Sequence, residues 1–135
     1  MMYAAYVEAH RWMGTPFVWS EDDCMVALVN YLVRLGYPDV AAQYRGTYDS
    51  AYTCNKIFKF LTDPVKPLAD VVAEIPLHRT ETPLMGDIGV IQFEGQRPTG
   101  GLFLGKNWAV RGEHAVHIDK AKSVFAAWEV PLARA

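Results

Sequence analysis

The sequence contains few cysteines, little net charge and no long apolar run. Its two cysteines, Cys24 and Cys54, form no Cys-x-x-Cys pair, so neither a disulfide framework nor a zinc site is predicted. The net charge is -2 at pH 7 and the basic residues are scattered, whereas nucleic-acid-binding proteins carry a clustered basic face. Charged residues interrupt every apolar stretch before it reaches the roughly 18 residues of a membrane span. We therefore expect no metal, no cofactor, no nucleic-acid partner and no membrane span.

The first residues also lack the pattern of a secretory signal peptide. Met1 is followed by Met2-Tyr3-Ala4-Ala5-Tyr6 rather than by a basic residue and a continuous apolar segment. We therefore expect the chain to be made and folded in a cytoplasm. A length of 135 residues with 51% apolar residues is typical of one ordinary domain with a sizeable core. Residues 1–135 are accordingly predicted to form a single domain.

The first half of the chain has apolar residues at the spacing of helices. Gly14-Thr15-Pro16 and Gly36-Tyr37-Pro38 are the stop signals of the first two, and a cap at Asp49 or Ser50 opens the third. A polar segment with Pro83 then reads as a connection. Helices are thus predicted over residues 3–13, over 24–35, from the cap to about Leu61, and as a short amphipathic segment over 68–75.

From Gly86 onward the pattern changes to short β-type runs separated by glycine, asparagine, lysine and aspartate turns. Helices followed by an antiparallel meander predict an α+β fold, with the N-terminal helices packed on one face of a C-terminal antiparallel sheet of about five strands. The predicted strands cover residues 87–93, 101–104, 108–111, 115–118 and 124–130.

Cys24 is the residue that carries the most chemical interest. It is expected at the first turn of the second helix, where the helix dipole and unpaired amide groups stabilise a thiolate. The neighbouring carboxylates of Asp22 and Asp23 act in the opposite direction, because negative charge disfavours a second negative charge. The residues alone therefore leave two interpretations open, a cysteine nucleophile or a small apolar cysteine packed beneath the sheet.

Two motifs give the chain a resemblance to a known family. The first is Gly14-x-Pro16-Phe17-x-Trp19-x-x-x-Asp23-Cys24 followed by a helix, and the second is Met85-Gly86-Asp87-Ile88-Gly89-Val90. Together they resemble the NlpC-type cell-wall cysteine peptidases, which have a papain-like fold. In that superfamily an Asp-Cys pair opens the nucleophile helix and a Gly-Asp turn opens the first strand. The chain most resembles small phage proteins of this length, encoded among tail genes, that end in a strand with an Ala-Trp pair, here Ala127-Trp128.

The sequence departs from the pattern of the active peptidases at two places. Active relatives usually follow the cysteine with Ser-Gly-Leu, whereas here it is followed by Met25-Val26-Ala27. They also open the second strand with the general-base histidine, and Thr99 stands at that position here. A threonine hydroxyl cannot accept a proton near neutral pH, so the thiol of Cys24 would lose its main activator. The resemblance thus implies the fold more strongly than the activity.

Another histidine could replace the missing base only if it reached the thiol. Of the four histidines, His10 and His78 are expected to be solvated. His114 and His117 flank a predicted strand, whose alternation puts them on opposite faces. If Val116 faces the core, His114 shares that side, so His114 is the one candidate for a displaced base; a strand-edge histidine is the alternative reading.

Two functions follow from the resemblance. The first is a non-catalytic structural or assembly component of a bacteriophage tail tip or baseplate, located in the virion after assembly in the host cytoplasm, with other tail proteins as partners. The second is a cysteine endopeptidase that cleaves cell-wall murein peptides during phage entry. In it, Cys24 would be the nucleophile beside Asp23, with an unconventional base. An acyl carrier or transferase on the same fold remains a third alternative. The missing base favours the structural function.

Overall fold

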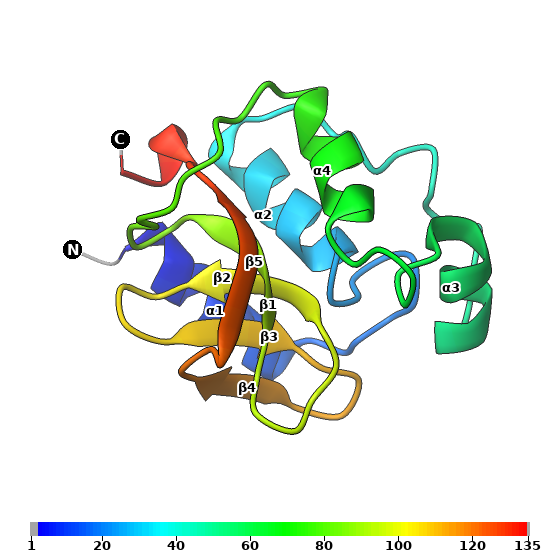
Figure 1. Ribbon diagram of the computed structural model, residues 1–135. Coiled ribbons are helices and arrows are strands. Elements are labelled where there is room, and N and C mark those ends of the chain that lie inside the picture. The colour runs from blue at the N-terminus through cyan, green and yellow to red at the C-terminus, as the bar shows by residue number, and fades with distance from the viewer. Residues whose placement is uncertain (1–2, 135) are drawn as a thin grey trace.

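The computed structural model describes residues 3–134 and has helices in its first half and strands in its second (Figure 1). The helices are α1 (Ala4–Gly14), α2 (Val26–Leu35), α3 (Ala51–Phe58) and α4 (Lys66–Ala73). The strands are β1 (Ile88–Gln92), β2 (Thr99–Phe103), β3 (Trp108–Arg111), β4 (Val116–Asp119) and β5 (Ser123–Trp128), and a 3-10 helix, η1 (Pro131–Arg134), follows. The predicted α+β fold is confirmed: four N-terminal helices pack against a C-terminal five-stranded antiparallel sheet.

The five strands form one sheet in the order β4-β3-β2-β1-β5, and all neighbours are antiparallel. The main core lies between one face of this sheet and the helices. A second, smaller apolar cluster covers the opposite face. The first cluster includes Trp12 of α1, Leu28 and Leu32 of α2, Leu68 of α4 and sheet residues such as Ile88, Val90 and Leu102.

The sequence patterns located the four α-helices and the five strands but not η1, and the largest differences among the located elements lie at their ends. Helix α2 begins at Val26 rather than at the predicted Cys24, so the cysteine lies in the turn that precedes the helix. Ser50 caps α3 as predicted, through a reciprocal capping box with Thr53, but the helix ends at Phe58 because Lys59 adopts a left-handed conformation. Strand β2 begins at Thr99, two residues before the prediction.

Gly100 of β2 is the point at which α2 meets the sheet. A Cβ atom at this position would lie 2.7 Å from the sulfur of Met25, 2.9 Å from Leu28 Cδ1 and 3.0 Å from the backbone oxygen of Cys24. Only glycine therefore allows the turn that carries Cys24 to rest directly on the strand that begins with Thr99.

We expect Gly100→Ala to lower the free energy of unfolding by about 1–3 kcal/mol, as overpacking of a filled core does. Urea unfolding measures the change. Gly14→Ala is the matched control, because no atom lies within 4 Å of a Cβ built on Gly14, and this variant should be at least as stable as the parent. An equally stable Gly100→Ala would show that the contact between α2 and β2 is loose.

Candidate functional site

A cleft of about 570 Å³ brings Cys24 and Thr99 together. One wall comes from the loop after α1, with Phe17 and Trp19, whose rings meet edge to face at 4.8 Å between centroids. The loop from β1 to β2 and the ends of β3 and β4 supply the other walls, which include Phe93, Arg97, Glu113 and His117. The two positions that the resemblance singled out therefore line one cleft, although 75 residues separate them in the chain (99 − 24).

Asp23 fixes the turn that presents Cys24. Its carboxylate is 1% exposed and accepts hydrogen bonds from the backbone N–H groups of Ser20 at 2.9 Å, Met25 at 3.0 Å and Val26 at 2.8 Å. The hydroxyl of Tyr48 donates a further, short bond to the same carboxylate. Two of these donors are amide groups at the start of α2 that have no partner within the helix. Asp23 is thus a helix cap with a fully used carboxylate, and it holds the backbone on both sides of Cys24.

The thiol of Cys24 is kept in its neutral form. Burial, together with the negative charge of Asp23, raises its pKa to about 12, although the hydroxyl of Thr99 opposes both effects. The amide groups at the start of α2 would normally stabilise a thiolate and lower its pKa. Here they do not offset the burial and the charge, because they already donate to Asp23. A thiol with so high a pKa is a poor nucleophile at neutral pH, because the thiolate is the reactive form.

We expect Asp23→Asn to lower the free energy of unfolding by about 1–3 kcal/mol, because the amide nitrogen cannot accept the bonds made by one carboxylate oxygen. The same change should lower the pKa values of Cys24, Cys54 and Tyr48, since the charge of Asp23 raises all three. Alkylation of Cys24 at pH 9, followed by mass spectrometry, measures this effect as a faster reaction.

Glu21→Gln is the matched control for Asp23→Asn, because Glu21 is exposed in the same loop. It should change neither the stability nor the alkylation rate. A folded Asp23→Asn variant whose Cys24 reacts at the parent rate would contradict the electrostatic role of Asp23.

The structure places His114 and His117 in different hollows. His114 is exposed in the bend before β4 and lines a neighbouring groove with Trp12 and Thr15. His117, which the sequence interpretation set aside, lines the cleft of Cys24. The pairing of His117 with Val110 explains its position, because paired residues share a face and Val110 belongs to the cluster on the sheet face opposite the main core. This register could not be read from alternation within one strand.

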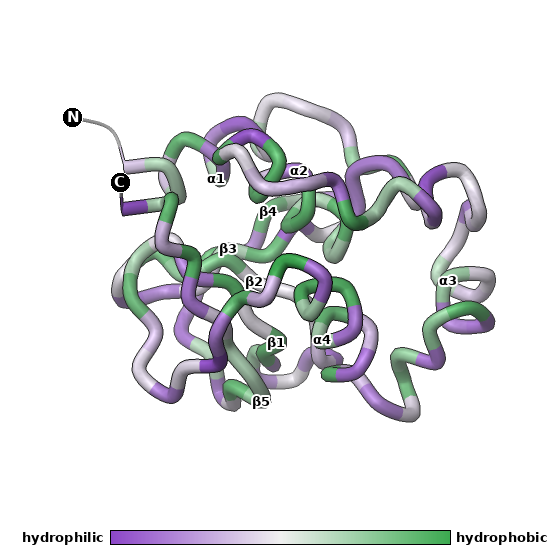
Figure 2. The backbone as a smooth tube through the Cα atoms, turned by 90° about the horizontal axis from the view of Figure 1, so that it is seen from above, coloured by the Kyte–Doolittle hydropathy of each residue, from purple (hydrophilic) through white to green (hydrophobic). Residues whose placement is uncertain are grey.

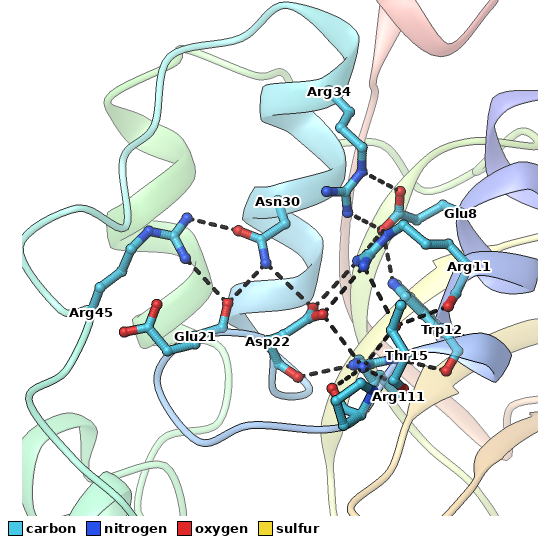
Figure 3. Close-up of polar contacts among 11 residues, drawn as sticks. Glu8, Arg11, Trp12, Thr15, Glu21, Asp22, Asn30, Arg34, Arg45 and Arg111 are labelled. Carbon is cyan, nitrogen blue, oxygen red and sulfur yellow. Dashed lines mark hydrogen bonds and ion pairs between the residues drawn. The ribbon is translucent and has the colours of Figure 1, made fainter.

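A network of charged residues holds the aromatic wall of the cleft against α1 and α2 (Figure 3). The buried carboxylate of Glu8 accepts hydrogen bonds from Arg11 at 2.9 Å and from Arg34. Arg11 also reaches Asp22 at 3.3 Å, and Arg111 approaches the same carboxylate at 3.4 Å. The network therefore ties the loop that contains Asp22 to both helices and to β3.

Arg111 is the most deeply buried cation of the network, at 2% exposure. Its guanidinium donates to the backbone oxygens of Trp12 at 2.9 Å, Thr15 at 3.0 Å and Asp22 at 2.9 Å, and also to that of Pro16. Burial lowers the pKa of Arg111, and the charge of Asp22 opposes that shift. This role of Arg111 was not predictable from the sequence, because a charged residue at a strand end usually faces solvent.

Cys54 lies on α3 and does not line the cleft of Cys24. Burial, together with the charge of Asp23, raises its pKa to about 11, although the hydroxyl of Tyr48 opposes the shift. Within residues 3–134, no group of three histidine, cysteine, aspartate or glutamate side chains could hold a metal ion. No helix in that range is long and apolar enough to cross a membrane.

The fold and the site define an α+β protein with a cysteine-lined cleft and no histidine at the second-strand position. The family model described as "Domain of unknown function (DUF6950)" matches residues 2–130. The chain therefore belongs to this family. No curated protein and no solved structure matches it.

Proposed function

We propose that the chain is a structural or assembly component of a bacteriophage tail tip or baseplate, built on a papain-like, NlpC-type fold that has lost its peptidase chemistry. The observation that carries the proposal is the neutral thiol of Cys24, whose pKa is raised to about 12. It shares a cleft with Thr99, the residue that the resemblance to the peptidases aligns with their general-base histidine. General-base help is worth roughly two to four orders of magnitude in rate, so its loss favours a non-catalytic role.

The outer face of α1 supports a role in assembly. Tyr3, Tyr6, Val7 and Met13 are all between 45% and 58% exposed, and they share one side of α1 with the exposed His10. An apolar stripe of this kind suits contacts with other tail-tip proteins better than contact with water. The partners in this proposal are proteins of the same tail, and the chain is located in the virion.

Mass spectrometry of purified virions tests the proposal. The chain should be present as a stable component of the phage that encodes it, and a phage with Cys24→Ala should assemble and infect at the parent level. Absence of the chain from virions would reject the structural role. Loss of infectivity in a Cys24→Ala phage with normal tails would favour the endopeptidase function instead.

The second candidate function is an endopeptidase that cleaves murein peptides, and one observation favours it. His117 lines the same cleft as Cys24, so an imidazole borders the space that the thiol faces. Cys24 would attack the scissile carbonyl, and His117 would have to take the thiol proton. The neutral, half-buried thiol is the observation against this function.

Paired histidine variants separate the two functions. We expect neither His117→Ala nor His114→Ala to change the alkylation rate of Cys24, because neither histidine contributes to the raised pKa of its thiol. His114 is the matched control, since it lies outside the cleft. If His117→Ala alone slowed the alkylation of Cys24, and the parent released peptides from purified murein, the endopeptidase function would replace the structural one.

A further inference from the structure

A second hollow lies on the other side of α2 from the sheet, among α2, α3 and α4. It has a volume of about 40 Å³ and is separate from the cleft of Cys24. Val26 and Val29 of α2, Leu68 and Val71 of α4, and the buried Ala41 contribute to its walls. Aliphatic side chains from three separate segments thus converge on one space.

The walls of this cavity offer water almost nothing to bind. The polar side-chain groups at its margin belong to Tyr44, Tyr48 and Cys54, and the hydroxyl of Tyr48 is already committed to Asp23. A volume of this size could hold water only if two or more polar partners faced it. Apolar cavities of proteins stay dry and accept apolar solutes instead.

Helix α3 forms one wall of the cavity without being packed into the core. None of its eight residues is buried, and Figures 1 and 2 both show it at the margin of the molecule, away from the sheet. Phe58 connects α3 to the rest of the domain through edge-to-face contacts, with ring centroids 4.9 Å from Tyr44 and 5.6 Å from Tyr48. Elements with so few buried contacts open at low free-energy cost.

We propose that the cavity beneath α3 is a binding site for a compact apolar solute, a small hydrocarbon or an atom the size of xenon, with α3 as its loosely packed outer wall. The natural close packing of proteins makes an unfilled apolar space beside a loosely held helix unusual. The inference is independent of the proposed tail function, because it rests only on the cavity and its cover.

Methyl NMR of the full chain under xenon pressure tests this site. The methyl resonances of Val26, Val29 and Leu68 should shift saturably with xenon, whereas those of Val90 and Leu102 in the main core should not. Ala41→Ile fills the cavity and should lose most of the shift. Ala42→Ile is the matched control, since Ala42 is exposed beside Ala41, and it should keep the full shift.

Two results would overturn the proposal. One is the absence of saturable shifts at the cavity methyl groups of the parent protein. The other is a shift in Ala41→Ile as large as in Ala42→Ile, which would place xenon elsewhere. If Ala41→Ile fails to fold, Val71→Ile replaces it as the test variant. This change adds one methyl group to the same cavity, because Val71 is half-buried and lines it. The xenon-induced shift must then be smaller in Val71→Ile than in the parent.

Discussion

Replacing Arg111 with methionine is expected to lower the free energy of unfolding by about 3–5 kcal/mol. The guanidinium is 2% exposed and donates to four backbone oxygens, those of Trp12, Thr15, Pro16 and Asp22. Methionine fills much of the same volume, but it leaves these four backbone oxygens without their hydrogen-bond donor. A domain of this size has a total stability of about 5–15 kcal/mol, so the loss is a large part of it.

Two further variants show whether the loss of stability in Arg111→Met comes from the missing hydrogen-bond donors of the guanidinium or only from its missing charge. Arg111→Lys keeps the charge but cannot serve four acceptors from one planar group, so it should recover less than half of the loss. Arg97→Met removes an exposed arginine at the cleft rim and should change stability by less than about 0.5 kcal/mol. Urea unfolding compares all three. An Arg111→Met variant as stable as Arg97→Met would show that the network of Figure 3 contributes little.

The fold could be predicted from the sequence because its signals are local. The stop signals after α1 and α2, the capping serine of α3 and the alternating runs after Gly86 act within a few residues. The errors have equally physical causes. Strand β2 begins at Thr99-Gly100, which carries no β-type pattern, because contact with the turn at Cys24 requires a glycine there. The later start of α2 follows from Asp23, which caps the helix from the preceding turn.

The site was less predictable because it depends on contacts between distant segments. The expectation that Cys24 and Thr99 belong to one site came from the resemblance to the peptidases and not from their spacing in the sequence. The position of His117 needed the register between β3 and β4. The role of Arg111 needed contacts with residues 89 to 99 positions away in the chain, and no local pattern announces them. The cavity beneath α3 likewise depends on how three helices pack.

At neutral pH, Cys24 should react with iodoacetamide roughly a hundred times more slowly than the thiol of an unfolded chain. Burial and the charge of Asp23 raise its pKa to about 12, whereas an unperturbed cysteine has a pKa of about 8.5. Since only the thiolate reacts, the rate at a fixed pH falls with the fraction of thiolate. The difference of several pKa units outweighs the gain in nucleophilicity of a more basic thiolate.

Cys24 is not an activated nucleophile in this structure, and measuring its alkylation rate as a function of pH puts that to the test. The measurement uses a Cys54→Ser background and mass spectrometry, with the same protein in urea as the reference. We expect a midpoint near 12 and slow reaction of the folded protein at every pH below about 9. A midpoint at or below about 8.5, with the folded protein reacting faster than the unfolded one, would contradict it and indicate a working base in the cleft.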